Sequence, residues 1–468
     1  MALCWTASIG LSGIDSDVEM EMMDLLAGAG SRLALGLTAG LMMTAGTAGF
    51  AKSADLDGDC CTDLEERVAA LDATTVTHGD RELSMKVSGW VNAAVVWWGD
   101  GGNATDGRDP GSFDKNSDVY FVNNSTAQSR VDIEGVAKLR ADLSAGYSIG
   151  LRPWGSKLSD ASQIASSVNP SNVDIRDTYV FLDSKQFGKV QLGQQVSAAD
   201  SAWYQDLGAS STWISNINPG AWNTSFYLRD VDANLANVTW GSVLQEMSDS
   251  QVPRIAYYSP QTQGFQAAAS YGGDKTWALA LYYARSMGTL SVSAGIGYDV
   301  SQGSSALADQ LVGTGLVDQH NTHLAKLGMS GSLYESRSGL YGTLGYSAAY
   351  AAVAGRDNAT NLYGKLGWRK NVSTLGETNI YGEYDRTTEA YGNGVSAHVW
   401  GAGVTQDIDS VDSILYVGYR HASLENSIVG ANLVLTADQT ATNSSPDAAA
   451  AIASQSFDAV MGGMVVQF

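Results

Sequence analysis

Charged side chains, rather than a catalytic constellation, are the residues of this sequence best suited to chemistry. The five histidines are scattered along the chain, and no glycine-rich loop precedes a helix. The stretch 196–252 has no strand pattern and carries one base, Arg229, with six acids: Asp200, Asp206, Asp230, Asp232, Glu246 and Asp249. Grouped carboxylates attract cations and orient dipolar molecules through their field. They predict electrostatic selection, and neither an enzyme nor a cofactor is expected.

Arginines at the heads of alternating segments form the second charged group: Arg130, Arg176 and Arg254. Neighbouring side chains of a β-strand point to opposite faces, so Arg130 faces away from Val131. Arg176 precedes Tyr179 and Phe181 by odd numbers of residues, so it lies on the opposite face of the strand. If the strand crosses a membrane and the two aromatic rings meet lipid, Arg176 faces away from the lipid. An arginine on the lipid face at mid-depth would cost about 2–4 kcal/mol, which favours the inward orientation.

The elements that must position these charges are strands. From Ser84 apolar and polar residues alternate with a period of two, which indicates a strand with one apolar face. Each alternating segment is near the ten residues that a tilted strand needs to cross a bilayer. After the first strand, the alternation recurs at about 127–140, 143–153, 174–184, 187–195, 253–261, 264–273, 275–287, 289–301, 321–335, 338–353, 360–371, 376–388, 394–408, 411–424 and 455–468. About sixteen antiparallel strands are therefore predicted, an even number as in bacterial membrane barrels.

The connections between these strands alternate in length. Short turns such as 141–142, 184–188 and 286–288 interleave with longer, polar loops. Short turns at one end and long loops at the other are typical of outer-membrane barrels, not of soluble sandwiches or propellers. The composition agrees, with 52 Gly, 7 Pro, 21 Tyr, 12 Trp and only 16% charged residues. The net charge of −22 argues against nucleic acid as a partner.

The acidic stretch 196–252 is also rich in aromatic residues, among them Trp203, Trp213, Trp222 and Trp240. Loops of this length are usually functional or disordered, and this aromatic content is too high for disorder. The simplest place for these rings to pack is the interior of a wide barrel.

Three motifs carry a resemblance to bacterial general (non-specific) trimeric porins. They are Ser129-Arg-Val-Asp-Ile-Glu-Gly135, Lys185-Gln-Phe-Gly-Lys-Val-Gln-Leu-Gly193 and Arg254-Ile-Ala-Tyr-Tyr-Ser-Pro-Gln-Thr-Gln-Gly-Phe265. The similarity covers roughly 84–468, and Cys60-Cys61-Thr-Asp-Leu-Glu-Glu-Arg-Val68 resembles the segment that precedes the barrel in alphaproteobacterial porins. The resemblance implies an all-β, sixteen-stranded antiparallel transmembrane barrel with an inward-folded third loop. It further implies a homotrimer in the outer membrane of a Gram-negative bacterium that passes small hydrophilic solutes and ions by passive diffusion.

The resemblance also implies a pore constriction. It places Arg130, Arg176 and Arg254 on a basic wall, opposite an acidic loop whose candidates are Asp200, Asp206, Asp230 and Asp232. Asn92 stands where the family often has a lysine, and Asp174 where another base is common, so the basic wall is thinner. Residues 1–51 hold five acids and one arginine, which leaves a net charge of about −18 on the remainder and predicts weak cation selectivity. An alternative is that the arginines merely pair with nearby carboxylates, and both can hold.

The N-terminal residues read as a leader. Arg32, the apolar run 33–43 and small residues up to Ala51 predict a signal peptide over 1–51. The acidic first nineteen residues do not suit a leader, so the true start is expected at Met20, Met22 or Met23.

A short helix is expected in 52–80, before the barrel domain 84–468. Apolar residues recur there at spacings of three and four: Cys61, Leu64, Val68, Leu71 and Thr75. Two heptads are marginal alone, but three copies tethered beneath a trimer could form a periplasmic coiled coil. The alternative is one amphipathic helix on the barrel rim. The adjacent Cys60 and Cys61 could be oxidised to a disulfide.

Two acidic groups suggest cations. Four residues match positions of a calcium-loop template: Asp55, Asp57, Asp59 and Glu66. Cys60 replaces the glycine of that template, and an acidic helix N-terminus explains the same residues, so no metal site is assigned. The first loop carries acids that could meet divalent cations bridging lipopolysaccharide, or form a solvated surface: Asp100, Asp106, Asp109, Asp114 and Asp118.

The chain ends on a strand whose last residue is Phe468. A terminal aromatic after alternating apolar positions resembles the signal read by the outer-membrane insertion machinery. Two further hypotheses remain beside passive diffusion: a substrate-selective channel, and an envelope tether acting through the N-terminal helix.

Overall fold

The computed structural model divides the chain into two units, residues 1–49 and 50–468, and the fold below is that of the second unit. The structure describes residues 74–78, 81–101, 115–153, 157–166, 173–218, 220–229, 235–244, 251–273, 276–302, 323–351, 355–425, 428–431, 433–435, 441–443, 450–452 and 455–468. Among these residues, no helix is long and apolar enough to cross a membrane. The leader, both cysteines of the Cys60–Cys61 pair and the calcium-loop candidates lie outside the described residues.

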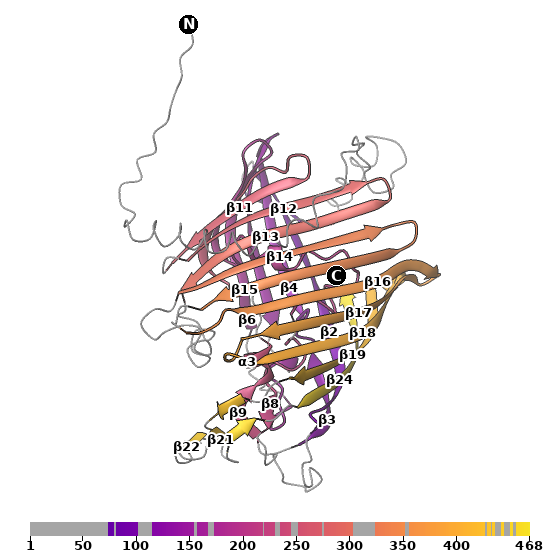
Figure 1. Cartoon of the computed structure of the whole chain (residues 1–468). Helices are drawn as coiled ribbons and strands as arrows, with labels where there is room; N and C mark the ends of the chain where they lie inside the picture. Colours follow the sequence, from indigo (N-terminus) through magenta and orange to yellow (C-terminus); the bar gives the residue numbers. More distant parts are fainter. Residues whose placement is uncertain are drawn as a thin grey trace. The chain divides into compact units, whose positions relative to one another are not determined.

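The described residues form a closed antiparallel barrel with sixteen strand positions, which confirms the predicted fold (Figure 1). The wall strands are β2 (Arg81–Gly99), β3 (Ser117–Asn123), β4 (Arg130–Arg140), β5 (Leu143–Pro153), β6 (Val173–Ser184), β7 (Gly188–Gln195), β10 (Val252–Tyr258), β11 (Phe265–Gly272), β12 (Trp277–Met287), β13 (Leu290–Gln302), β14 (His323–Glu335), β15 (Leu340–Tyr350), β16 (Ala359–Ser373), β17 (Gly376–Thr388), β18 (Ser396–Ile408), β19 (Ser413–Leu424) and β24 (Ser456–Gln467). β3 and β4 share one position, because both pair with β2.

The barrel closes where the last strand meets the first. Trp90 to Gly99 of β2 pair with β24, and Gly89 exchanges two backbone hydrogen bonds with Phe468, at 2.9 and 3.1 Å. The Phe468 ring is exposed on the outside. A residue larger than glycine at position 89 would place its Cβ 2.2 Å from the Arg130 carbonyl oxygen, so the seam needs glycine there.

One part of the segment 52–80 differs from the expected helix. Thr74–His78 form strand β1, paired with Arg81 to Met85 of β2. These β2 residues lie beyond the end of β24, so β1 supplies a backbone partner that the edge would otherwise lack. The β-branched sequence of β1 also suits a strand better than a helix.

The connections follow the predicted two-sided pattern. At one end β4–β5, β6–β7, β12–β13 and β14–β15 are joined by tight turns, and at the other end the connections are longer, except for the four residues 273–276 between β11 and β12. The loops at the long-loop end contain further short elements: η1 (Leu158–Asp160), η2 (Asp200–Trp203), β8 (Tyr227–Arg229), β9 (Leu235–Thr239), α3 (Trp240–Val243), β20 (Ile428–Ala431), β21 (Leu433–Leu435), β22 (Ala441–Asn443) and β23 (Ala450–Ile452). The turn at the short-turn end between β18 and β19 holds η3 (Asp409–Val411).

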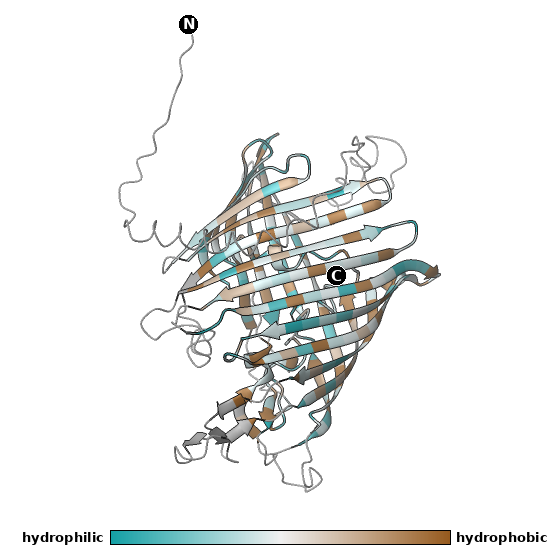
Figure 2. Ribbon diagram, in the orientation of Figure 1, coloured by the Kyte–Doolittle hydropathy of each residue, from teal (hydrophilic) through white to brown (hydrophobic). Residues whose placement is uncertain are grey.

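The two faces of the wall have opposite polarity. Leu366 is 75% exposed on the outside, whereas the adjacent Lys365 is 2% exposed on the inside. Val91 and Asn92 show the same contrast on β2, and Figure 2 shows apolar and polar residues alternating along the strands. In a bilayer the outer face meets hydrocarbon, which favours this arrangement.

Aromatic side chains lie near both ends of the outer face. Phe265 packs on Tyr283 near the short turns, with ring centroids 4.6 Å apart. Tyr298 contacts both Trp277 and Tyr350 near the long loops. Such girdles mark the two interfaces of a membrane barrel.

The main hydrophobic core lies inside the barrel, because the third loop folds inward. Its Phe226 and Trp240 pack with Trp98 of β2 and Phe457 of β24, and all four rings are buried. Trp203 fills the space that Gly328 of β14 leaves on the inner wall. The aromatic residues of the loop therefore pack against the inside of the wall, as the sequence predicted.

Candidate functional site

A cavity of about 610 Å³ remains between the third loop and the inner wall. Its wall side includes residues of β2, β4, β5, β6, β15 and β16, and its loop side is formed mainly by the segment from Val196 to Thr224. The charged residues that line it are Arg130, Arg152, Arg176, Asp200 and Asp206. The structure thus brings four of the predicted site residues together and adds Arg152.

Strand register places the arginines beside one another. Val131 pairs with Leu151, which puts Arg130 and Arg152 level on adjacent strands. Arg152 in turn pairs with Asp174 of β6. The sequence signal for Arg152 is its position two residues after Gly150, on the face of the strand that points inward.

Each of these arginines has a carboxylate partner on the wall. Arg130 lies 2.7 Å from Asp132, Arg152 lies 2.5 Å from Asp174, and Arg176 lies 2.6 Å from Asp177. The Arg130 guanidinium also stacks 4.1 Å above the Trp90 ring. The wall here is therefore a row of ion pairs, in which Arg130, Arg152 and Arg176 line the cavity and also pair with carboxylates.

The orientation of Arg176 has a different cause from the predicted one. Phe181 is buried and Tyr179 is half-buried, both on the inner face, while Val180 and Leu182 are exposed outside. The premise that the two aromatic rings meet lipid was wrong. Arg176 still points inward because the register shifts beside it, so that Arg176 and Asp177 both face the interior.

The predicted acidic residues of the third loop differ in their surroundings. Asp206 forms an ion pair of 2.5 Å with Lys365 and accepts hydrogen bonds from the Thr343 hydroxyl and the Gly208 amide, both 2.8 Å. Asp200 stands in η2, at the start of the inserted segment. Asp230 and Asp232 lie outside the described residues.

Arg254 is placed differently from the other predicted arginines. It is 4% exposed and does not line the cavity. Its backbone carbonyl accepts a hydrogen bond of 3.2 Å from the Gln195 amide, beneath the start of the third loop. Strand alternation does not reveal this burial, which keeps Arg254 out of the cavity lining.

A wall ion pair and its hydrogen bonds to the loop hold the far side of the loop. Arg420 pairs with Glu383 at 2.7 Å, and the Ser215 hydroxyl donates to Glu383 at 2.6 Å. Arg420 also stacks on Trp222 at 5.0 Å. Sequence analysis missed Lys365, Glu383 and Arg420, whose only signal was an inward position in an alternating strand.

The first loop differs from the expected acidic surface. Asp100 is buried and pairs with Arg229 of the third loop at 2.8 Å, and Gln163 of the second loop donates to Asp100 at 3.0 Å. Asp118 belongs to β3 and pairs with Lys115 at 2.5 Å. Asp100 therefore ties three loops together. Asp106, Asp109 and Asp114 lie outside the described residues, which contain no group of three or more potential metal ligands.

The closed barrel, its apolar outer face and its charged inner cavity define a membrane channel. The chain belongs to the Gram-negative porin family, whose family model matches residues 37–427. The family supports a location in the outer membrane and a role as a diffusion channel.

Solved structures match the chain at low sequence identity, and the first named here shares its fold. The anion-selective porin from Comamonas acidovorans is 17% identical, with a TM-score of 0.51 over 83% of this chain and 100% of that chain. In vitro folded OmpT, an outer membrane protein of Vibrio cholerae, is 13% identical, with a TM-score of 0.48 over 85% and 100%. Salmonella typhi OmpF in complex with daunomycin is also 13% identical, with a TM-score of 0.47 over 84% and 100%. The search of curated proteins finds no match.

Proposed function

We propose that the protein is a passive, water-filled channel for small hydrophilic solutes and ions. The cavity between the arginine row and the inserted loop carries this proposal, because a sixteen-stranded barrel without such a narrowing would be much wider than a small solute. Charges on both sides of the opening orient polar solutes and disfavour apolar ones.

The proposed selectivity is weakly cationic. Each arginine of the row is matched by a wall carboxylate, so the row adds little net positive charge. Asp200 and Asp206 stand on the loop side of the cavity, and the whole chain carries −22.

The proposed assembly is a homotrimer with the short turns in the periplasm. Phe468, which ends the seam strand, serves as the signal for the insertion machinery, and lipopolysaccharide surrounds the long-loop end. The Cys60–Val68 motif supports an alphaproteobacterial type. A substrate-selective channel and an envelope tether through 52–80 remain the alternatives.

Purified protein in planar bilayers tests the channel. Stepwise ion conductance with a small cation-directed reversal potential in a salt gradient is expected. A non-conducting trimer would contradict the proposal, and block by one sugar or anion alone would favour the substrate-selective alternative. Deleting 52–73, which leaves β1 in place, tests the tether, since only that role predicts loss of envelope attachment with unchanged conductance.

A further inference from the structure

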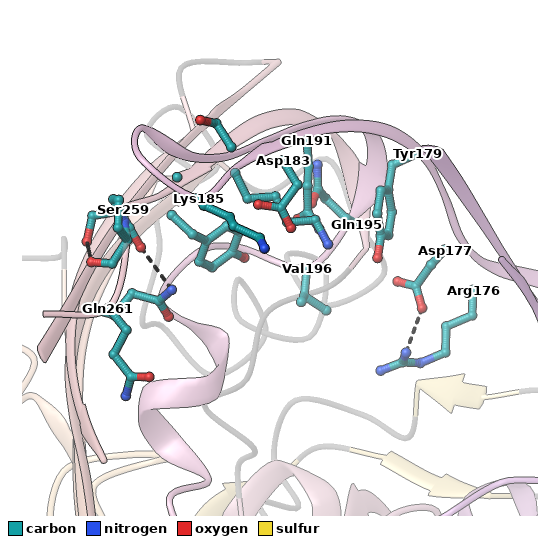
Figure 3. A pocket seen from close by; sticks show the side chains of 16 residues that line it. Arg176, Asp177, Tyr179, Asp183, Lys185, Gln191, Gln195, Val196, Ser259 and Gln261 are labelled. Carbon is teal, nitrogen blue, oxygen red and sulfur yellow. Dashed lines mark hydrogen bonds and ion pairs between the residues drawn. The ribbon is translucent and has the colours of Figure 1, made fainter. Parts of the chain in front are cut away.

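A second cavity, of about 670 Å³, lies on the inner wall at the short-turn end (Figure 3). It is lined by side chains of β6, β7 and β10 together with the turns that join β6 to β7 and β10 to β11. Arg176 and Val196 line both this cavity and the constriction cavity. A solute that leaves the constriction along this wall therefore enters the second cavity next.

Opposite charges face this cavity without neutralising each other. Asp183, Lys189 and Tyr258 stand directly opposite one another on three adjacent strands. Directly opposed residues have Cβ atoms about 4.5–5.5 Å apart. Lys189 nevertheless places its ammonium 4.2 Å above the Phe181 ring, and the Asp183 carboxylate forms no ion pair or hydrogen bond with another described residue. Both charges are thus available to a solute.

The side-chain amide of Gln191 lines the same cavity as these charges. The Gln191 side chain is 9% exposed and lines the cavity, yet its amide forms no hydrogen bond with any described residue. A polar solute in the cavity can donate to and accept from this amide in place of water. Figure 3 shows Gln191, Asp183, Lys185 and Gln195 among the residues that line the cavity, with the Arg176–Asp177 pair at one end.

We infer that this cavity is a subsite for small zwitterions, such as free amino acids, on the exit side of the channel. Asp183 binds the ammonium group, Lys189 with Lys185 binds the carboxylate, and Gln191 donates to and accepts from polar atoms between them. A neutral polyol offers neither charge, and a simple ion offers only one. The inference rests on the proposed channel function and specifies one class of solute for it.

Liposome swelling with L-threonine and with erythritol, a neutral polyol of similar size, tests the subsite. The double variant Asp183→Asn with Lys189→Gln should lower the threonine-to-erythritol permeation ratio about two- to fivefold, as expected for loss of exposed charge contacts. The erythritol rate should stay unchanged. Gln191→Leu, which preserves side-chain bulk and both charges, should lower the ratio in the same direction.

The matched control is Arg140→Gln with Asp142→Asn, an ion pair of 3.6 Å at the neighbouring β4–β5 turn that does not line the cavity. It should leave the ratio unchanged. A ratio that is the same in wild type and in both cavity variants, or that falls equally in the control, would overturn the subsite. Wild-type protein that passes neither solute would instead contradict the channel function itself.

Discussion

The Asp206 carboxylate of the third loop lies 2.5 Å from the Lys365 ammonium of β16, and both side chains are almost fully buried inside the barrel. The pair joins the first part of the inserted loop to the wall. Lys365 also donates to the Ser215 carbonyl at 3.2 Å, so it contacts the loop at two points. The position of the loop, and with it the size of the opening, depends on this contact.

Lys365→Met should release the loop. Removing one partner leaves the other charge buried and unpaired, which typically costs about 3–5 kcal/mol. We expect a lower unfolding temperature in detergent and larger, noisier single-channel conductance. Adding Asp206→Asn to this variant removes the carboxylate that has lost its partner and should restore part of the stability. Equal stability of the two variants would show that the pair does not hold the loop.

Gly328→Ala should displace the loop by a different route. A Cβ atom at Gly328 would lie 2.3 Å from the Trp203 ring, whereas one at Gly331, on the outer face of the same strand, would meet nothing closer than 3.7 Å. Overpacking of this kind costs about 1–3 kcal/mol. Thermal unfolding of Gly328→Ala, with Gly331→Ala as control, measures the difference. Indistinguishable melting curves would mean that Trp203 is not seated against Gly328.

Ion selectivity should shift in opposite directions when the two sides of the opening are changed. Asp200→Asn removes a negative charge and should move the reversal potential toward anions, while Arg152→Gln should move it toward cations. Because Arg152 pairs with Asp174, the double variant Arg152→Gln with Asp174→Asn should return close to wild type. Reversal potentials in a salt gradient measure all three. Shifts of the same sign for Asp200→Asn and Arg152→Gln would contradict the arrangement.

Glu425, at the long-loop end, should make stability depend on acid pH. The Ser396 hydroxyl donates to its carboxylate at 2.7 Å, and Arg386 and His398 add positive charge, which holds the pKa of Glu425 below its ordinary value of 4.5. A carboxylate with a lowered folded-state pKa stabilises the fold above its unfolded pKa, and this contribution is lost as pH falls through the folded pKa. The stability difference between wild type and Glu425→Gln should be constant near neutral pH and shrink below about pH 4.5. A difference that persists unchanged into strong acid would refute the contact.

Strand alternation determined most of the fold, because it is a local property. Side chains two residues apart share a face, so an apolar series such as Val91, Val95 and Trp97 fixes which face meets lipid. The sixteen strands, the two-sided loops and the inward packing of the Trp-rich loop follow from such local patterns. The prediction that Arg130 and Asp200 border one opening needed the family resemblance in addition to the strand pattern.

Tertiary structure alone decided how the charges are matched. Asp206 and Lys365 are far apart in sequence, and nothing local indicates that they meet. The bulge that turns both Arg176 and Asp177 inward is a one-residue shift in the register between β5 and β6. Such a shift changes which face a side chain occupies, and the composition of the two strands does not reveal it. Arg254 is buried and does not line the constriction cavity. Register, closure and the path of the loop set these contacts, and they depend on residues that only the closed barrel brings together.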